Sequence, residues 1–397
     1  MTPRDALELA RLLLDTLRLS GDPDPAEMRT RWAQADQAAL VMLAKYEGAD
    51  IWLARRLRTL GITLEPASAG ALDAAATRAR ARTLRADAAL RAVLQAFRAT
   101  QVECVLLKSA ALRRLTDRLP YADARATADV DLLVPEADGD HALGVLRARG
   151  WGLLNVSALR HSGDAAIPLP GERETLRALL AGAPKHHLPS VADASGVAIE
   201  LHLTTGPVVR PMEAWRRTLS DRAAVTLEAE HAWVPGDTWL LVHAVTHALV
   251  DAEEHARSGL RLRYWLDGAV LLGGGQVRWD SVRERLRTGE MGPPALARAW
   301  LWVAAQLAGQ DVGIDALGTG DMAALQLDRL LAWRLTVLTR YSASDAWAEK
   351  LLEEGARIEG GLAPERPWKP EKRARRIRRR AAQLAARAAW RWWRVRL

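Results

Sequence analysis

The chain has 397 residues, of which 49% are hydrophobic. Because single cores stop growing at roughly 250–300 residues, we expect more than one subdomain. The formal net charge is +8, but residues 366–397 hold 13 of the 56 Lys and Arg residues and one of the 48 acidic residues, which leaves −4 on residues 1–365. This mildly acidic body, which lacks a basic stripe, argues against a nucleic-acid-binding core.

The cysteine content and the absence of targeting signals indicate the compartment. Cys104 is the single cysteine, so no intrachain disulfide can form, and the N-terminus shows no signal-peptide pattern. No run of 18 or more apolar residues occurs, which argues against a membrane-spanning helix. We therefore expect a cytoplasmic protein.

Residues 1–98 predict an N-terminal helical region. Their apolar residues recur with helical periodicity in three stretches, Ala6–Leu14, Ala38–Ala44 and Leu90–Phe97. Gly61 and the segment 66–70 interrupt the pattern.

Residues 99–206 predict a small α/β core of about 100 residues, because short β-branched runs alternate with helical patterns. The expected strands are Val102–Leu107, Val130–Val134, Trp151–Val156 and Val197–Leu203. The expected helices begin at about Ala110 and at Asp138, and the segment 157–190 is irregular.

Residues 207–352 predict a C-terminal helical region, whose helical periodicity runs from Thr238 to about Leu352. Residues 353–397 predict a Gly- and Pro-containing linker followed by a basic tail. The expected fold class is therefore α+β and mostly helical overall, with a small α/β core between two helical regions.

The most informative motif is Asp129-Val-Asp131 in the second expected strand. Side chains at i and i+2 of a strand point to the same face. Paired carboxylates on one face suit Mg²⁺, which takes hard oxygen ligands and keeps other positions for water and phosphate. A D-x-D pattern is also common on solvated strand edges, so the motif needs support from other residues.

Four further residues strengthen the motif. Lys108-Ser109 joins an expected strand to a helix, where backbone N–H groups can hold phosphate oxygens and Lys108 adds positive charge. Arg125 lies four residues before Asp129 and can neutralise phosphate. Glu200 lies within an apolar strand, where a carboxylate is costly unless it is paired or bound to metal.

The ordered set of motifs resembles an uncharacterised bacterial nucleotidyltransferase family of the polymerase-β-type superfamily. That family reads K-G, R-x3-D-[IV]-D-L-L-V, E-L-H and L-x-x-L-x-D in the same order, and the resemblance spans about residues 30–310. The matching segments here are Lys108-Ser109, Arg125 to Val134, Glu200-Leu-His202 and Leu262 to Asp267. The resemblance implies a polymerase-β-like core.

The resemblance also implies a function. Asp129, Asp131 and Glu200 would hold catalytic Mg²⁺ or Mn²⁺, and Lys108, Ser109 and Arg125 would bind the triphosphate. The reaction would transfer a nucleoside monophosphate from a nucleoside triphosphate, with ATP as the expected substrate, to a small-molecule, peptide or protein acceptor. Two metals would bridge the attacking and leaving oxygens.

The turn departs from the family pattern at Ser109, where the family has glycine. A turn without its most permissive residue can hinder the approach of phosphate to the backbone. The alternative function is therefore a catalytically degenerate nucleotidyltransferase-like protein that binds nucleotide or a partner.

Several downstream residues have more than one interpretation. His243, His247, Asp251 and His255 recur every four residues, which fits a zinc site, a packed histidine pair, or, by the family resemblance, residues that face the cleft beside the core.

His202 shares the face of Glu200 and either contacts a metal-bound water or phosphate or lines the sheet. Arg263 and Asp267 form either an i,i+4 ion pair or a substrate contact, and the neighbouring Arg261 is a further candidate for substrate contact.

The tail, residues 371–397, is Arg-rich with apolar residues at near-helical spacing and three tryptophans close to its end. This pattern fits an amphipathic helix on an anionic membrane surface, which would make the protein peripheral to a membrane. There are three other interpretations: the tail contacts nucleic acid, it contacts an acidic partner, or it is a disordered, solvated tail.

Overall fold

The computed structural model describes residues 2–19, 23–117, 119, 121–127, 129–154, 188–205, 209–255, 261–310 and 327–340. The predicted linker and basic tail, residues 353–397, lie outside the described residues, as do residues 155–187 of the expected irregular segment. No helix in the described ranges is long and apolar enough to cross a membrane.

The chain divides into two compact units, each built from segments that are far apart in the sequence. The first unit contains the described residues within 1–76, 245–273 and 286–340, and the second contains those within 77–244 and 274–285. Two helices continue from one unit into the other, α5 (Pro66–Ala99) and α11 (Asp237–His255). The boundaries predicted at residues 98, 206 and 352 stay predictions.

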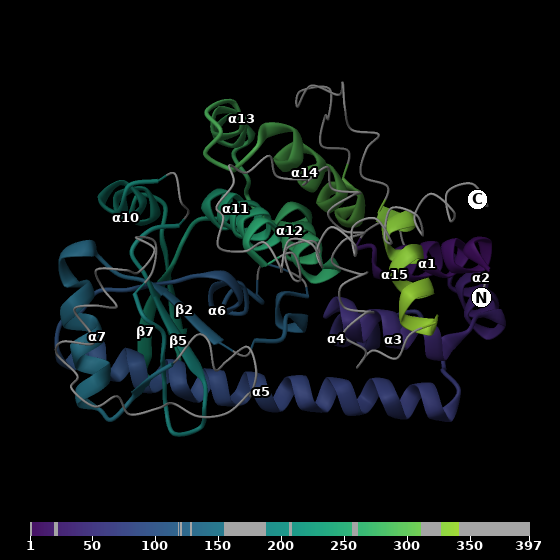
Figure 1. The fold of residues 1–397 in the computed structure, drawn as a ribbon, viewed down its shortest axis with the longest axis horizontal. Coiled ribbons are helices and arrows are strands. Elements are labelled where there is room, and N and C mark those ends of the chain that lie inside the picture. The colour runs from purple at the N-terminus through teal and green to yellow at the C-terminus, as the bar shows by residue number, and fades with distance from the viewer. Residues whose placement is uncertain are drawn as a thin grey trace, which may run out of the picture. The chain divides into compact units, whose positions relative to one another are not determined.

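The first unit is helical throughout its described part (Figure 1). Besides the parts of α5 and α11, its helices are α1 (Pro3–Leu17), α2 (Pro25–Gln34), α3 (Gln37–Glu47), α4 (Asp50–Thr59), α12 (Leu262–Gly274), α14 (Pro294–Ala308) and α15 (Leu327–Arg340). Local sequence begins these helices: Thr2 and Asp5 cap α1 reciprocally, with Pro3 as the first helical residue.

A buried ion pair ties three helices of the first unit together. Arg334 Nη1 on α15 donates to both carboxylate oxygens of Glu47 on α3, at 2.7 and 2.8 Å. The same carboxylate accepts the backbone N–H of Leu262 at the start of α12, at 2.7 Å. The side chains of Glu47 and Arg334 are 0% and 4% exposed, so each charge depends on the other.

The second unit contains one mixed sheet of seven strands, in the order β3-β4-β5-β2-β1-β7-β6. The strands are β1 (Val105–Leu106), β2 (Asp129–Leu133), β3 (Gly152–Leu153), β4 (Val191–Ala192), β5 (Ala198–His202), β6 (Ala223–Leu227) and β7 (Glu230–Val234). β2 pairs with β5 and β1 pairs with β7 in parallel, and the other pairs are antiparallel.

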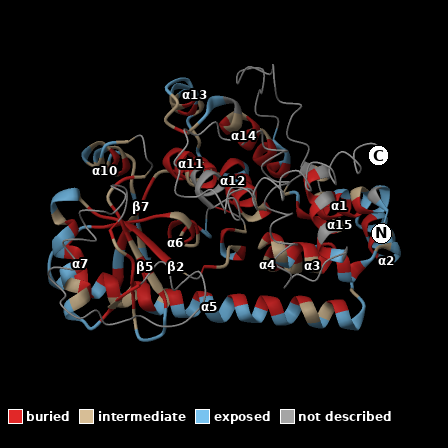
Figure 2. Cartoon of the chain, viewed as in Figure 1, coloured by how far each residue is buried: buried red, intermediate tan, exposed pale blue. Residues whose placement is uncertain are grey.

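Helices accompany this sheet in the second unit. They are the later part of α5, α6 (Lys108–Leu112), α7 (Gly139–Ala148), α10 (Pro211–Leu219), the first part of α11 and α13 (Trp279–Arg287), together with the 3-10 turns η1 (Ala122–Ala124) and η2 (Glu136–Asp138). Along α5 one side is buried and the other exposed (Figure 2). The buried residues near its end follow the helical repeat: Leu90, Val93, Leu94 and Phe97.

The α+β, mostly helical fold class predicted from the sequence is confirmed. The predicted strands are present with different bounds: Val102–Leu107 contributes only β1, Val197–Leu203 contributes β5, and β2 begins and ends one residue before Val130–Val134. Helix α6 begins at Lys108 instead of Ala110. The β6–β7 hairpin was not predicted. Its turn, Glu228-Ala229, contains no Gly, Asn or Pro, and Glu228 adopts φ 55° without any of the residues that favour this conformation.

The buried pair in the first unit leads to a stability prediction. Glu47→Ala should lower the free energy of unfolding by about 3–5 kcal/mol, because it leaves the Arg334 charge buried without its carboxylate. The measurement is urea-induced unfolding. Glu8→Ala is the matched control, since Glu8 pairs with Arg4 at 3.2 Å with side chains 64% and 84% exposed, and it should change stability by less than about 0.5 kcal/mol. Equal effects of the two substitutions would contradict the prediction.

Candidate active site

The parallel pairing of β2 with β5 brings the predicted carboxylates together. In its register Asp131 is the partner of Glu200, and Leu133 is the partner of His202. Paired residues on neighbouring strands point to the same face, and so do residues two positions apart. Asp129, Asp131, Glu200 and His202 therefore share one face of the sheet.

The opposite face of these two strands is apolar. Val130, Leu132, Ile199 and Leu201 are each at most 1% exposed. Burial of this face sets the register, because a shift by one residue would turn the carboxylates toward the core.

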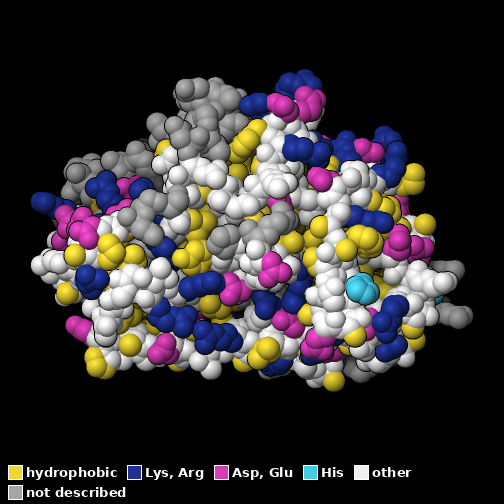
Figure 3. Space-filling view, turned by 180° about the vertical axis from the view of Figure 1, so that it is seen from behind, with side chains coloured by type: hydrophobic (Ala, Val, Ile, Leu, Met, Phe, Trp, Pro, Cys, Tyr) yellow, Lys and Arg dark blue, Asp and Glu magenta, His cyan; other side chains and the backbone are white. Residues whose placement is uncertain are grey.

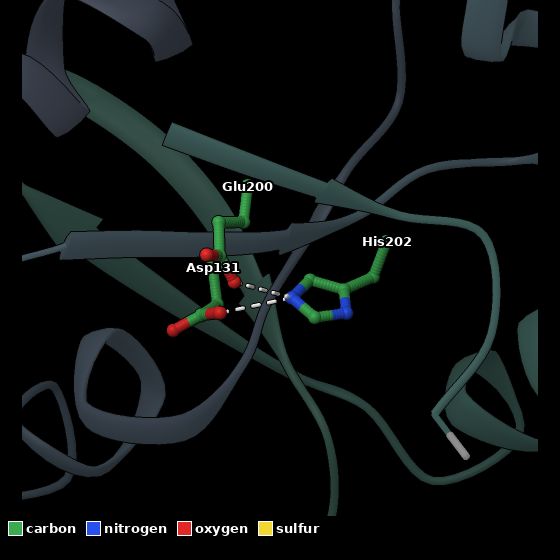
Figure 4. Close-up of side chains that lie close together, drawn as sticks. All are labelled: Asp131, Glu200 and His202. Carbon is green, nitrogen blue, oxygen red and sulfur yellow. Dashed lines mark hydrogen bonds and ion pairs between the residues drawn. The ribbon is translucent and has the colours of Figure 1, made fainter. Parts of the chain in front are cut away.

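Asp131, Glu200 and His202 form a compact cluster (Figure 4). His202 Nε2 donates to Asp131 Oδ1 at 2.8 Å and lies 3.6 Å from Glu200 Oε2. One ligand atom from each residue lies within 4.8 Å of the others, which is close enough to hold one metal ion. The Asp131 side chain is 1% exposed and that of Glu200 is 30% exposed, so one edge of the cluster is accessible.

Lys108 completes the cluster with a positive charge. Its Nζ lies 2.6 Å from Asp131 Oδ1 and 3.7 Å from Glu200 Oε2, and its side chain is 16% exposed. Burial opposes the charged ammonium, but these two carboxylates outweigh it and raise the pKa of Lys108 above its ordinary value. The backbone of Lys108 is left-handed, with φ 48°. Few residues other than Gly, Asn and Asp adopt this conformation.

Ser109 connects the turn to β2. Thr127 Oγ1 donates its proton to the carbonyl oxygen of Asp129 at 2.7 Å. The Ser109 hydroxyl lies 2.7 Å from Thr127 Oγ1 and is therefore the donor in the bond between these two hydroxyls. Ser109 is 3% exposed and lies within α6. The left-handed position of this turn is therefore Lys108, one residue before Ser109, and the expectation that the missing glycine at Ser109 hinders phosphate approach stays a prediction.

The charges of the cluster are unequally balanced. Burial and the neighbouring Asp131 raise the pKa of Asp129 to about 6. Burial also opposes ionisation of Asp131 and Glu200, but Lys108 and His202 outweigh it and hold the pKa of both carboxyls below the ordinary range. Asp129 is thus the carboxylate whose negative charge is least compensated.

Two neighbouring histidines of this unit, His202 and His243, have pKa values shifted in opposite directions. Burial lowers the pKa of His202, but its hydrogen bonds to Asp131 and Glu200 prevail and raise it above the ordinary value. The pKa of His243 on α11 is lowered to about 3, first by burial and then by the charges of Lys108 and His202. The two rings lie edge to face, with centroids 6.4 Å apart. His243 is therefore a neutral neighbour of the cluster at physiological pH.

Comparison with known protein families agrees with this geometry. The model of an uncharacterised nucleotidyltransferase family matches residues 33–309, which include the whole cluster and the helices around it. The chain belongs to this nucleotidyltransferase family. No significant match was found among curated proteins or among solved structures. The resemblance noted from the sequence motifs is confirmed, and a nucleotide is the implied substrate.

The remaining residues predicted for the nucleotidyltransferase site lie in different places. Arg125 follows η1, where its Nη1 donates to the carbonyl oxygen of Ala126 at 3.2 Å and its charge lowers the pKa of Asp129. His247, Arg263 and Asp267 belong to the first unit.

There the His247 ring lies 5.7 Å from the Tyr264 ring, and Arg263 Nη2 donates to the Tyr264 hydroxyl at 2.9 Å. Asp267 is 8% exposed. The side chains of Asp251 and His255, which the zinc interpretation needs, lie outside the described residues.

Thr127 is a site residue that was not predicted. It anchors the carbonyl of Asp129 and accepts from Ser109, and its backbone N–H donates to Thr83 Oγ1 on α5 at 3.3 Å. The period-two pattern Thr127, Asp129, Asp131 is the signal that would have revealed it, because all three positions share one face of an extended strand.

The cluster fits a divalent metal ion. Carboxylate oxygens are the ligands that Mg²⁺ and Mn²⁺ prefer, and an imidazole among them is compatible with Mn²⁺. The buried carboxylate of Asp131 already has a cation beside it, the Lys108 ammonium at 2.6 Å, as a buried charge requires. Asp131, Glu200 and His202 supply the ligand atoms that lie close enough together to hold one ion, and Asp129 lies on the same face of the sheet.

The raised pKa of Asp129 predicts a pH-dependent effect of one substitution. In the metal-free protein, ionisation of Asp129 costs stability as pH rises through the interval from its ordinary value of 3.8 to about 6. Asp129→Asn removes this cost, so it should stabilise the protein by about 2 kcal/mol at pH 8 and by much less at pH 4.5. The measurement is urea unfolding in EDTA at both pH values. An effect of Asp129→Asn that does not depend on pH would contradict the prediction.

Proposed function

We propose that the protein is a Mg²⁺- or Mn²⁺-dependent nucleotidyltransferase with a polymerase-β-like core. It transfers a nucleoside monophosphate from a nucleoside triphosphate, with ATP as the expected donor, to a small-molecule, peptide or protein acceptor. One observation carries the proposal: the carboxylates of Asp129, Asp131 and Glu200 share one face of two parallel strands in a chain that belongs to a nucleotidyltransferase family.

The chemistry assigns a role to each group. The acceptor attacks the α-phosphorus, the bond from that phosphorus to the bridging oxygen breaks, and pyrophosphate leaves. Divalent metal held by Asp129, Asp131 and Glu200 would supply the positive charge that stabilises the phosphoryl oxygens.

The protein side chains position the reactants. Arg125 and Lys108 bind phosphate oxygens. Glu200 is more exposed than Asp131, at 30% against 1%, and accepts the proton of the acceptor. The hydrogen bonds from Ser109 through Thr127 to Asp129 hold the turn against β2.

The charge distribution favours an acceptor other than nucleic acid. Among the described side chains on the face in Figure 3, acidic and basic groups are interspersed. Residues 1–365 carry a net −4. Phosphate backbones are bound mainly through clustered Lys and Arg, so a small molecule or a peptide is the better supported acceptor.

A transfer assay tests the proposed function. Asp129→Asn and Asp131→Asn should each reduce metal-dependent pyrophosphate release by at least about a hundredfold, because each removes a ligand charge. Asp140→Asn, an exposed aspartate on α7, is the matched control and should leave release unchanged.

The assay uses each of the four nucleoside triphosphates with cell extract as the acceptor source, and mass spectrometry identifies the adduct. Pyrophosphate release that survives in Asp131→Asn would contradict the proposal. Absence of metal-dependent release from the wild type in every condition would favour the nucleotide-binding, inactive alternative.

We also propose that residues 371–397 bind an anionic membrane surface. The support is sequence composition: these residues include 11 Lys and Arg residues against one glutamate, and three tryptophans, Trp390, Trp392 and Trp393, lie near their end. Basic residues gain free energy near anionic lipids, and tryptophan prefers the interface.

A vesicle assay tests this tail proposal. The full chain should bind phosphatidylserine vesicles at low salt, with binding weakened by 0.5 M salt and lost on deletion of 371–397. Replacing the three tryptophans by alanine keeps the charge and should weaken binding less than the deletion. Binding that persists in the deletion variant would contradict the proposal.

A further inference from the structure

Lys108 combines two features that are rare together. Its backbone adopts φ 48°, a conformation that costs free energy for a residue with a Cβ. Its ammonium is nevertheless held against Asp131 and Glu200 with a side chain 16% exposed. Strain of this kind persists where the surroundings compel it, and it is concentrated at functional sites.

The ammonium contacts the oxygens that a metal ion would use. Asp131 Oδ1 lies 2.6 Å from Lys108 Nζ and 2.8 Å from His202 Nε2. Glu200 Oε2 lies 3.7 and 3.6 Å from the same two nitrogens. A divalent ion at these oxygens would lie within a few ångströms of the ammonium, where two like charges repel strongly in a site shielded from water.

We propose that Lys108 is a resident counter-cation that a divalent metal must displace. In the metal-free protein its ammonium takes the place of the ion between Asp131 and Glu200, and metal binding at these carboxylates releases it. The released ammonium then binds the triphosphate of the nucleotide, the anion that arrives with the metal. This inference rests on the proposed function for the role of the displaced ammonium, but the displacement itself needs only a metal ion.

Metal affinity provides the first test. Lys108→Met keeps the length of the side chain and removes its charge. Isothermal titration with Mn²⁺ alone should give an association constant at least about tenfold higher for Lys108→Met than for the wild type. Arg125→Met is the control for the loss of one positive charge near the site, since the charge of Arg125 acts on Asp129, and its effect should be less than about threefold.

The chemical reactivity of Lys108 in the wild-type protein provides the second test, and it does not depend on the folding of a variant. Mn²⁺ should increase the labelling of Lys108 by an amine-reactive reagent at least about threefold. Lys45, exposed on α3, serves as the internal standard and should not change. Mass spectrometry of the Lys108 and Lys45 peptides reads both in one sample.

Two outcomes would overturn the inference. One is a Mn²⁺ affinity that is unchanged or lower in Lys108→Met, or raised no more than in Arg125→Met. The other is labelling of Lys108 that Mn²⁺ leaves unchanged or reduces. Both measurements omit nucleotide. If Mn²⁺ displaces Lys108 but the protein transfers no nucleotide, the proposed function is refuted and the counter-cation role of Lys108 is retained.

Discussion

The pairing of β2 with β5 is the constraint on which the candidate site depends. Because the strands are parallel and in register, Asp131 lies beside Glu200, and the period of two adds Asp129 and His202 to the same face. Burial of the apolar side chains on the opposite face stabilises the register of these two strands, and that register keeps the carboxylates together. Residues 69 positions apart in the chain thereby become neighbours.

This pairing gathers several carboxylates at a site that is largely shielded from solvent. Lys108 and His202 compensate the charge at Asp131 and Glu200, whose pKa values are lowered, whereas the pKa of Asp129 is raised to about 6. The negative charge is therefore better compensated at Asp131 and Glu200 than at Asp129. A divalent ion would gain most at Asp129, and its arrival would compete with the ammonium at Asp131.

Much of this site could be predicted from the sequence, because it rests on local periodicity. The alternation in β2 and β5 places Asp129 with Asp131 and Glu200 with His202 without any knowledge of the tertiary structure. The parallel pairing of the two strands could not be predicted, since long-range register depends on packing. The contact of Lys108 with Asp131 was hidden for the same reason: a left-handed lysine is selected by its surroundings and not by its own propensity.

The organisation of the chain shows the same limit. The helical and strand patterns together predicted the α+β class, but they do not reveal that α5 and α11 each continue from one unit into the other. The β6–β7 strands escaped prediction because their connection lacks the residues that mark tight turns. Elements with a local sequence signal can be predicted from that signal. Elements whose conformation is decided by tertiary contacts cannot.

The position of a bound metal ion would show whether the carboxylates of β2 and β5 form a metal site and whether Lys108 leaves it. A crystal structure of the protein with Mn²⁺ and a nucleoside triphosphate analogue that cannot be cleaved at the α-phosphorus would locate the ion by its anomalous scattering. We expect Mn²⁺ at the carboxylate oxygens of Asp129 and Asp131 and in contact with the triphosphate, with the Lys108 ammonium moved from Asp131 to a phosphate oxygen. Nucleotide bound away from β2, or the Lys108–Asp131 contact intact beside a bound ion, would contradict it.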